Sequence, residues 1–284
     1  MKFAFYSRFE TMLAEVGVQK AAEYARSLGL DGVEFYCDAV ANVSAIPSVA
    51  DAKEVRAVLD AYGLPLVCVS CAYDAVACPD AVRTMQKTIE ITSALGAPFL
   101  HHTLLIHPVK GESEAEALRK IDLAADAAVK IADAAKEYGL TCLYEDQGRY
   151  VNGREKFGRF FENVKSRAEN VGVCADVGNI LFVDEAPEDF LSAFAHDIKH
   201  VHVKDYLRKS VPSSPGVGWK PTKRGDYLRS TVIGHGVVDY PRVMAVLHGI
   251  GYDGYFGLEL DHPEPFEAGV MQALAYLPPL FTEK

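Results

Sequence analysis

The strongest constraint on the fold is a regular alternation of short strand-like runs with longer segments of helical period. Eight runs rich in β-branched and aromatic residues recur along the chain, and apolar positions between them return every three or four residues. The runs cover residues 2–7, 32–36, 66–70, 99–104, 141–146, 171–176, 199–205 and 255–260. Several helical segments end at a glycine just before the next run, as at Gly63, Gly96 and Gly139, which is typical of a helix C-terminus.

Eight strands alternating with roughly eight helices predict an α/β fold, a single (β/α)8 TIM barrel that occupies residues 1–284 as one domain. A barrel of this kind typically takes ~250 residues. An open doubly wound sheet is the competing layout, but neither a G-x-G-x-x-G nor a G-x-x-x-x-G-K-S/T motif follows any of the strands. The barrel is therefore the predicted architecture.

The composition restricts where the chain works and what it binds. Hydrophobic residues make up 49% of the chain and charged residues 24%, which is enough apolar material for a large core. The first residues lack the apolar run of a signal peptide, and no stretch approaches ~18 consecutive apolar residues. We therefore expect a cytoplasmic protein that does not cross a membrane. The formal net charge of −10 argues against nucleic acid as a partner.

The six cysteines lie mostly inside apolar runs, as reduced core cysteines do. Cys68 and Cys71 form a C-x-x-C, but a strand directs side chains three residues apart to opposite faces. No second pair completes a zinc site. We therefore expect neither a redox role nor a metal role for this pair.

Acidic and histidine side chains stand at the ends of the last four predicted strands. They include Glu145, Asp176, His202 and Glu259. All the βα loops of a parallel barrel open at the C-terminal ends of the strands, so these side chains are expected to meet there. Three carboxylates so close together repel one another unless a cation neutralises them, and one imidazole with three carboxylates suits a divalent metal ion. We predict one metal ion at these four residues, Mn²⁺ in the first place, with Co²⁺, Mg²⁺, Zn²⁺ or Fe²⁺ as alternatives.

A single aspartate or a single histidine at a strand end would be weaker evidence for a metal site. An aspartate after a strand often caps the next helix, so Asp176 by itself would favour a cap as much as a ligand. A single histidine on a strand is more often a core residue. However, His200, His202 and Lys204 alternate with Val201 and Val203. This period of two places the polar side chains on one face and the valines on the other, as in a barrel strand that faces a site.

The segments YED, ADVGN, HVHVKD and IGHGVVDYPRVMAVLHGIGYDGYFGLELD resemble the xylose-isomerase-like TIM barrels. That superfamily includes ketose 3-epimerases, hydroxypyruvate isomerases, and inosose isomerases and dehydratases. The resemblance covers essentially the whole chain and is strongest from residue 141 to 262. The ketose epimerases of this family bind their metal through Glu, Asp, His and Glu on strands five to eight, which correspond to Glu145, Asp176, His202 and Glu259.

The resemblance also implies roles for single residues. The two glutamates would act as an acid/base pair, and Arg208, six residues after His202, would contact the substrate. The epimerases carry a histidine three residues after the aspartate ligand, where this chain has Asn179. Asparagine can bond a substrate hydroxyl, but it carries neither a proton nor a charge.

The chemistry that two glutamates beside one metal ion imply is removal of a proton from a carbon next to a carbonyl. The metal would stabilise the enediolate, while Glu145 and Glu259 remove and return the proton. We therefore predict an isomerase, a metal-dependent epimerase or isomerase of a sugar or sugar phosphate. Loss of a β-hydroxyl from the same enediolate would instead make the chain a lyase, such as an inosose dehydratase or a C-glycoside-cleaving subunit, and this is the alternative.

The walls of the substrate pocket are predicted from strand positions. The expected substrate contacts are Tyr6, His102, Asn179, Lys204 and Arg208, with Glu34 or Tyr36 as further candidates. Strand parity lets only one of His101 and His102 face inward, and we favour His102.

The segment from residue 206 to 230 is rich in proline and glycine and carries six basic side chains against one acid. The simple interpretation is a solvated loop or a subunit contact. The alternative is a lid over an anionic sugar, in which Lys220, Lys223 and Arg224 bind the anion and Trp219 covers the ring.

Two other functions fit less well. An abasic-site endonuclease of the same superfamily uses three zinc ions and would need a histidine near position 179 and basic loops; Asn179 and the net charge of −10 oppose it. His235, within a G-x-G turn, is interpreted as a loop histidine. A non-catalytic sugar-binding barrel is disfavoured because all four ligands are present.

Members of the resembled family commonly form dimers or tetramers, so we expect a homo-oligomer.

Overall fold

Eight parallel strands close into a barrel in the order β1-β11-β7-β6-β5-β4-β3-β2. The computed structural model describes residues 1–105, 111–148 and 150–281. The barrel strands are β1 (Lys2–Phe5), β2 (Gly32–Asp38), β3 (Leu66–Ala72), β4 (Phe99–His102), β5 (Thr141–Glu145), β6 (Val171–Asp176), β7 (Ile198–Val203) and β11 (Tyr255–Leu258). The predicted (β/α)8 barrel is confirmed, and each barrel strand overlaps one of the predicted runs.

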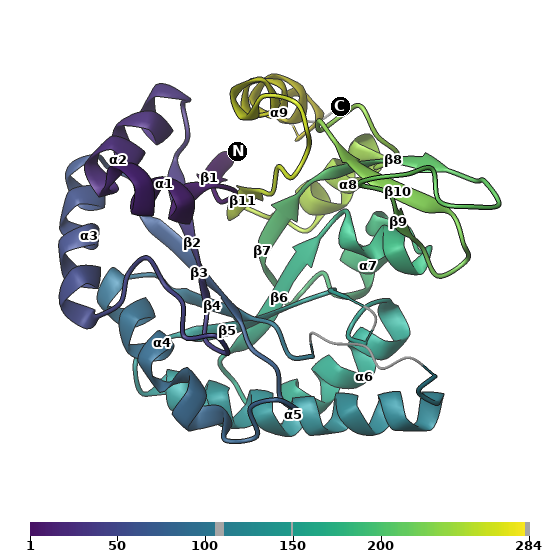
Figure 1. Ribbon diagram of the computed structural model, residues 1–284, viewed down its shortest axis with the longest axis horizontal. Helices are drawn as coiled ribbons and strands as arrows, with labels where there is room; N and C mark the ends of the chain where they lie inside the picture. Colours follow the sequence, from purple (N-terminus) through teal and green to yellow (C-terminus); the bar gives the residue numbers. More distant parts are fainter. Residues whose placement is uncertain (106–110, 149, 282–284) are drawn as a thin grey trace.

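Helices surround the strands as an outer ring, which Figure 1 shows around most of the barrel. They are α1 (Phe9–Val16), α2 (Val18–Ser27), α3 (Val49–Ala61), α4 (Ala81–Leu95), α5 (Glu114–Lys136), α6 (Arg154–Lys165), α7 (Pro187–Ala193), α8 (Tyr240–Gly249) and α9 (Phe266–Phe281), with a 3₁₀ helix η1 (Asn179–Val183) after β6. Within the described residues, none of these helices has the length and apolar character that a membrane crossing requires.

Local signals at the helix ends explain why the periodic pattern predicted the helices well. Helix α5 begins with a capping box, in which Ser113 and Glu116 each bond the backbone N–H of the other. At the other end of the helices, Gly63, Gly96 and Gly139 have φ of 62°, 75° and 71°. This left-handed conformation strains residues with a Cβ, so glycine ends a helix here at little cost.

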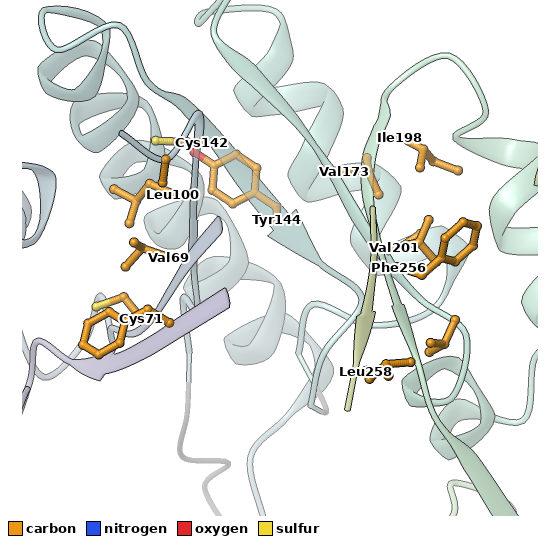
Figure 2. Close-up of a cluster of buried hydrophobic side chains, with 14 of the residues drawn as sticks. Val69, Cys71, Leu100, Cys142, Tyr144, Val173, Ile198, Val201, Phe256 and Leu258 are labelled. Carbon is orange, nitrogen blue, oxygen red and sulfur yellow. The ribbon is translucent and has the colours of Figure 1, made fainter. Parts of the chain in front are cut away.

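The main core lies between the strands and the helices. Figure 2 shows part of it, with side chains such as Val69, Leu100 and Val201 from β3, β4 and β7. A second, smaller cluster of buried residues comprises Ala4, Val67, Cys68, Leu143 and Cys174. Cys68 belongs to this second cluster and Cys71 to the main core, so the two cysteines face opposite sides of β3, as predicted.

The segment after β7 differs from the prediction. The predicted strand 199–205 ends at Val203, and the proline-rich segment that follows forms a three-stranded antiparallel sheet in the order β8-β10-β9. We call this the side sheet; its strands are β8 (Asp205–Lys209), β9 (Lys220–Pro221) and β10 (Tyr227–Thr231). It projects beside the barrel in Figure 1.

Asp205 joins the first strand of the side sheet to the segment that leads into α8. Its carboxylate accepts hydrogen bonds from the backbone N–H groups of Tyr206, Gly234, Gly236 and Val238, at 2.8 to 3.1 Å. A Cβ on Gly236 would lie 2.1 Å from Asp205 Oδ1, so this close approach requires glycine. Lys223 N also donates to Phe182 O at 2.8 Å. The side sheet is therefore bonded to η1 as well as to the segment before α8.

Candidate metal centre

Four side chains from four adjacent barrel strands meet at the C-terminal ends of those strands. Glu145 ends β5, Asp176 ends β6, His202 lies near the end of β7, and Glu259 follows β11. Each contributes one nitrogen or oxygen atom, and these four atoms all lie within 4.8 Å of one another. We call Glu145, Asp176, His202 and Glu259 the carboxylate–histidine cluster.

His202, within the cluster, and Lys204, next to it, contact the three carboxylates. His202 Nδ1 lies 2.8 Å from Glu145 Oε1 and 3.7 Å from Glu259 Oε2. Lys204 Nζ lies 2.9 Å from Asp176 Oδ2 and 2.6 Å from Glu259 Oε1. The other Asp176 oxygen accepts the backbone N–H groups of Gly178 and Asn179. Asp176 is thus both a turn residue and a member of the cluster.

A fourth carboxylate lies on the opposite side of the His202 ring. Glu34, in β2, is fully buried, and its oxygens lie 3.1 Å and 3.3 Å from His202 Nε2. It also faces His200 Nε2 at 2.9 Å and accepts the Ser70 hydroxyl at 2.6 Å. Burial alone would raise the pKa of Glu34, but His202 and His200 outweigh burial and hold that pKa well below 4.5. Glu34 is therefore an acceptor that fixes the His202 ring.

The ring nitrogens of His202 have different partners as a result. A hydrogen on Nε2 satisfies Glu34, which leaves Nδ1 directed at Glu145 and Glu259. Burial lowers the pKa of His202, but Cys174, Glu34 and Glu145 together raise it well above 6.5. His202 Nδ1 is therefore the ring nitrogen that could bind a metal ion together with Glu145 and Glu259.

The charges of the site fit a divalent cation. The carboxylates of Glu34, Glu145, Asp176 and Glu259 lie close together around His202 and Lys204. Burial raises the pKa of Asp176 and the pKa of Glu259, and Lys204 offsets only part of the shift. A bound cation would favour the charged form of these carboxylates.

Cys174 also lies within reach of Glu145 and His202. Burial raises the pKa of its thiol, so the thiolate that binds metals is disfavoured. The donor set is therefore one imidazole and three carboxylates, a set typical of Mn²⁺, Mg²⁺ or Co²⁺ sites.

The choice of His102 as the inward histidine was wrong. His101 lies 2.9 Å from the Ser70 hydroxyl, 3.7 Å from Glu145 and edge-on to the His202 ring. The His102 ring instead packs edge-on against Tyr73 and Tyr144, which belong to the main core. Strand β4 spans Phe99–His102 and so ends two residues before the predicted run 99–104 does.

Of the other predicted substrate contacts, two lie next to the cluster and one does not. Tyr6 stacks on the His202 ring with 4.9 Å between centroids, and Asn179 Oδ1 accepts from Lys204 Nζ at 3.2 Å. Both residues therefore adjoin the cluster. Arg208 instead lies in β8, where it pairs with Asp184 and with Asp226. Its charge is taken up by these two carboxylates within the side sheet and the adjoining turn.

The residues of the predicted lid lie in different places. Lys220 and Lys223 line a cavity next to Asn179, whereas the Trp219 ring lies under Lys209 Nζ at 4.8 Å. Arg224 bonds Asp184 through its backbone N–H. The structure thus shows a three-stranded sheet over this segment, and Trp219 packs against Lys209.

Comparison with known proteins identifies the fold and the family. The family described as "Xylose isomerase-like TIM barrel" matches residues 22–280. An inosose dehydratase of Geobacillus thermodenitrificans is 28% identical over 154 residues, 51% of this chain and 50% of that protein. The chain thus matches about half the length of such curated relatives.

Two solved structures show the same fold over nearly the whole chain. D-psicose 3-epimerase with D-tagatose from Clostridium cellulolyticum has a TM-score of 0.74 and 15% identity and covers 100% of both chains. A xylose isomerase-like TIM barrel protein from Mycobacterium smegmatis in complex with magnesium has a TM-score of 0.73 and 18% identity, covering 99% of this chain and 96% of that one. On the match over residues 22–280, the chain belongs to the xylose isomerase-like TIM barrel family.

Proposed function

We propose that this chain is a divalent-metal-dependent enzyme that moves a proton on a carbon next to the carbonyl of a sugar-like substrate, as an epimerase or isomerase. The observation that carries the proposal is the arrangement of two glutamates from different strands around one histidine nitrogen. Glu145 and Glu259 lie 2.8 Å and 3.7 Å from His202 Nδ1. They would share one cation with Asp176 and His202, and Mn²⁺ is the ion we expect.

The two glutamates would divide the proton transfer between them. A cation in the cluster would supply electrophilic stabilisation of the developing negative charge on the substrate oxygen. One glutamate carboxylate removes the proton from the carbon next to the carbonyl, and the other glutamate returns a proton. Burial raises the pKa of Glu259, and Lys204 offsets part of this rise.

Three neighbouring residues would control the geometry of this transfer. Lys204 contacts Glu259 and Asp176 and would fix both carboxylates. Tyr6 stacks on His202 and would cover one side of the ring. Asn179 would hydrogen-bond a substrate hydroxyl through its amide nitrogen, which has no partner among the described residues. The expected contact of Arg208 with the substrate would require Arg208 to leave Asp184 and Asp226.

Dehydration is the second candidate, and the matches to inosose dehydratases favour it. The first step is the same, since a glutamate again removes the proton next to the carbonyl. In a dehydratase the neighbouring hydroxyl then leaves as water, whereas an epimerase or isomerase returns the proton to carbon. The two reactions therefore share the glutamates and differ in the product.

One experiment tests the proposal and separates the two reactions. Metal content is measured on purified protein, and ketoses, inososes and hydroxypyruvate are incubated with it in D₂O and followed by NMR. The wild type is expected to bind one metal ion per chain and to exchange one C–H in a single substrate class; Glu259→Gln should lose exchange by at least a hundredfold.

Glu162→Gln serves as the matched control, because Glu162 is an exposed residue of α6. Deuterium in a product that keeps its oxygen atoms identifies an epimerase or isomerase, and loss of water identifies a dehydratase. Absence of bound metal in wild type, or exchange that survives in Glu259→Gln, would contradict the proposal.

A further inference from the structure

A cavity of about 870 Å³ lies between the barrel helices and the side sheet. Most of its wall comes from three segments: the start of α6, the helix η1 with the residues after it, and β9 with the turn that follows. Asn179 belongs to this wall, and its Oδ1 accepts from Lys204 Nζ, which contacts Asp176 and Glu259. The cavity is therefore linked to the carboxylate–histidine cluster through two side chains.

Two lysines in the cavity wall lack an acidic partner. Lys220 and Lys223 both line the cavity and are both exposed, and neither makes an ion pair with any of the residues that the structure describes. Arg208, in the same side sheet, is instead paired with Asp184 and Asp226. The positive charges of the two lysines are therefore available to a ligand.

The other charges of the wall largely cancel within it. Lys156 pairs with Glu114 at 3.0 Å, and Glu185 pairs with Arg154 at 3.1 Å. This leaves Glu155 alone against the two free lysines among the described residues of the wall. Glu155 lies in the first turn of α6, where the positive end of the helix favours an acidic side chain. The wall thus keeps an excess of positive charge in a chain whose formal net charge is −10.

The backbone that carries the two lysines is held on both sides. Lys220 lies in β9 and pairs with β10 opposite Leu228. The backbone N–H of Lys223 donates to Phe182 O, in η1, at 2.8 Å. Binding of an anion would therefore order only the two lysine side chains and not the chain that bears them, which limits the entropy lost.

The rest of the wall suits a small carbon skeleton. Phe182, Val183 and Pro221 line the cavity beside the lysines, and its volume falls in the range of about 300–1,000 Å³ that whole small ligands occupy. The carboxylates of the cluster repel an anion, whereas the free lysines attract one. A substrate with an anionic end would therefore bind with that end in the cavity and its carbonyl at the cluster.

We propose that Lys220 and Lys223 bind an anionic group of the substrate, a carboxylate or a phosphate, at the end remote from the carbonyl. The two ammonium groups donate to the oxygens of the anion. Trp219 and Arg224 take no part, since neither lines the cavity. That the anion belongs to the substrate rests on the proposed function; that the cavity binds an anion does not, because neither lysine belongs to the cluster.

The first test is binding of small anions to the full chain, measured by calorimetry. D-glucose 6-phosphate and D-glucuronate are compared with D-glucose in EDTA, which removes any metal ion that could itself bind an anion. At least one of the two anions is expected to bind tenfold or more tightly than glucose, and added NaCl should weaken it. Tighter binding of glucose 6-phosphate identifies a phosphate site, and tighter binding of glucuronate identifies a carboxylate site.

Lysine variants then assign the binding to the cavity. Lys220→Gln combined with Lys223→Gln should weaken the anion about tenfold or more, as expected when charge-assisted hydrogen bonds are lost. Lys209→Gln is the matched control, because Lys209 is an exposed lysine of the side sheet that does not line the cavity. Its effect should stay below about twofold, since it changes the net charge without removing a contact to the anion.

The second test joins the cavity to the reaction. Sugar phosphates and sugar acids are added to the deuterium-exchange panel, and the exchanging substrate is measured with wild type and with the double variant. The double variant should raise KM about tenfold and leave kcat within about twofold, because the lysines bind the substrate away from the reacting carbon. If no substrate exchanges, the proposed function fails, and the binding test still decides whether the cavity takes an anion.

Three results would overturn the proposal. The first is that neither anion binds more tightly than glucose. The second is that Lys209→Gln weakens the anion as much as the double variant does, which would indicate a general effect of charge. The third is that the exchanging substrate is a neutral sugar whose KM is the same in wild type and in the double variant.

Discussion

Replacement of Glu34 by glutamine should weaken metal binding although Glu34 is not expected to be a ligand. Its carboxylate accepts from His202 Nε2 at 3.1 Å and so directs Nδ1 at the other ligands. Glutamine keeps the shape but has a single acceptor oxygen and loses the charge that holds the ring. Loss of such a carboxylate partner typically costs ten- to a hundredfold in metal affinity. This corresponds to about 1.4–2.8 kcal/mol.

The effect should lie at the upper end of that range because Glu34 is fully buried and has three donors. His200 Nε2 and the Ser70 hydroxyl are the other two, at 2.9 Å and 2.6 Å. The glutamine NH₂ cannot accept from a histidine N–H, so one of the two histidines loses its partner. We therefore expect an affinity loss of about fiftyfold.

The assay is competition between the protein and a chromophoric chelator for Co²⁺, together with the visible spectrum of bound Co²⁺. Glu34→Gln should raise the Kd and change the spectrum, because the His202 ligand is no longer held in one orientation. Ser70→Ala is the matched control; it removes a donor to Glu34 but leaves the Glu34–His202 contact, so its effect should stay below about fivefold. A Kd for Glu34→Gln within threefold of wild type would refute the reasoning.

Three further predictions concern stability. Lys204→Met removes the ammonium group that pairs with Asp176 and Glu259, so in EDTA the free energy of unfolding by urea should fall by about 3–5 kcal/mol. Saturating Mn²⁺ should then raise the free energy of unfolding by a larger amount in Lys204→Met than in wild type. An equal rise in the two proteins would contradict this. Burial lowers the pKa of His102 to about 4, so its stabilising contribution is complete above pH ~6.5 and declines as the pH falls. Between pH 7 and 5 wild type should lose about 2 kcal/mol more than His102→Gln in urea unfolding, and parallel pH curves would exclude it. Asp205→Asn should speed hydrogen exchange at the amides of Gly234 and Gly236, measured by mass spectrometry, with β1 to β4 unchanged as the internal control.

The barrel could be predicted from the sequence because its signals are local. Strand period, helix period and glycines such as Gly96 each act within a few residues, and all of them agree. The side sheet could not be predicted in the same way. Its proline- and glycine-rich sequence indicates a loop, and the contact that orders it joins Asp205 to Gly234, Gly236 and Val238, about thirty residues later.

In the candidate site, too, some residues could be predicted from the sequence and others could not. Glu145, Asp176, His202 and Glu259 could be placed together because they all stand at strand ends of a parallel barrel. Glu34 and His101 lie within strands, where an inward polar side chain and a core residue look alike in the sequence. Choosing between His101 and His102 also needs the strand register to one residue, and sequence patterns do not give strand ends with that accuracy.

The two parts of the site are built in ways that suit different tasks. The carboxylate–histidine cluster stands on barrel strands and is held from inside the barrel by Glu34, so its geometry is fixed by rigid elements. The cavity next to it is walled by η1, the start of α6 and the side sheet, which are connecting segments after strands. Changes in such segments alter a pocket with little effect on the strands that they join. The reaction should therefore depend on residues that the strand pattern reveals, whereas the choice of substrate should depend on side chains of these connecting segments, which no strand pattern places.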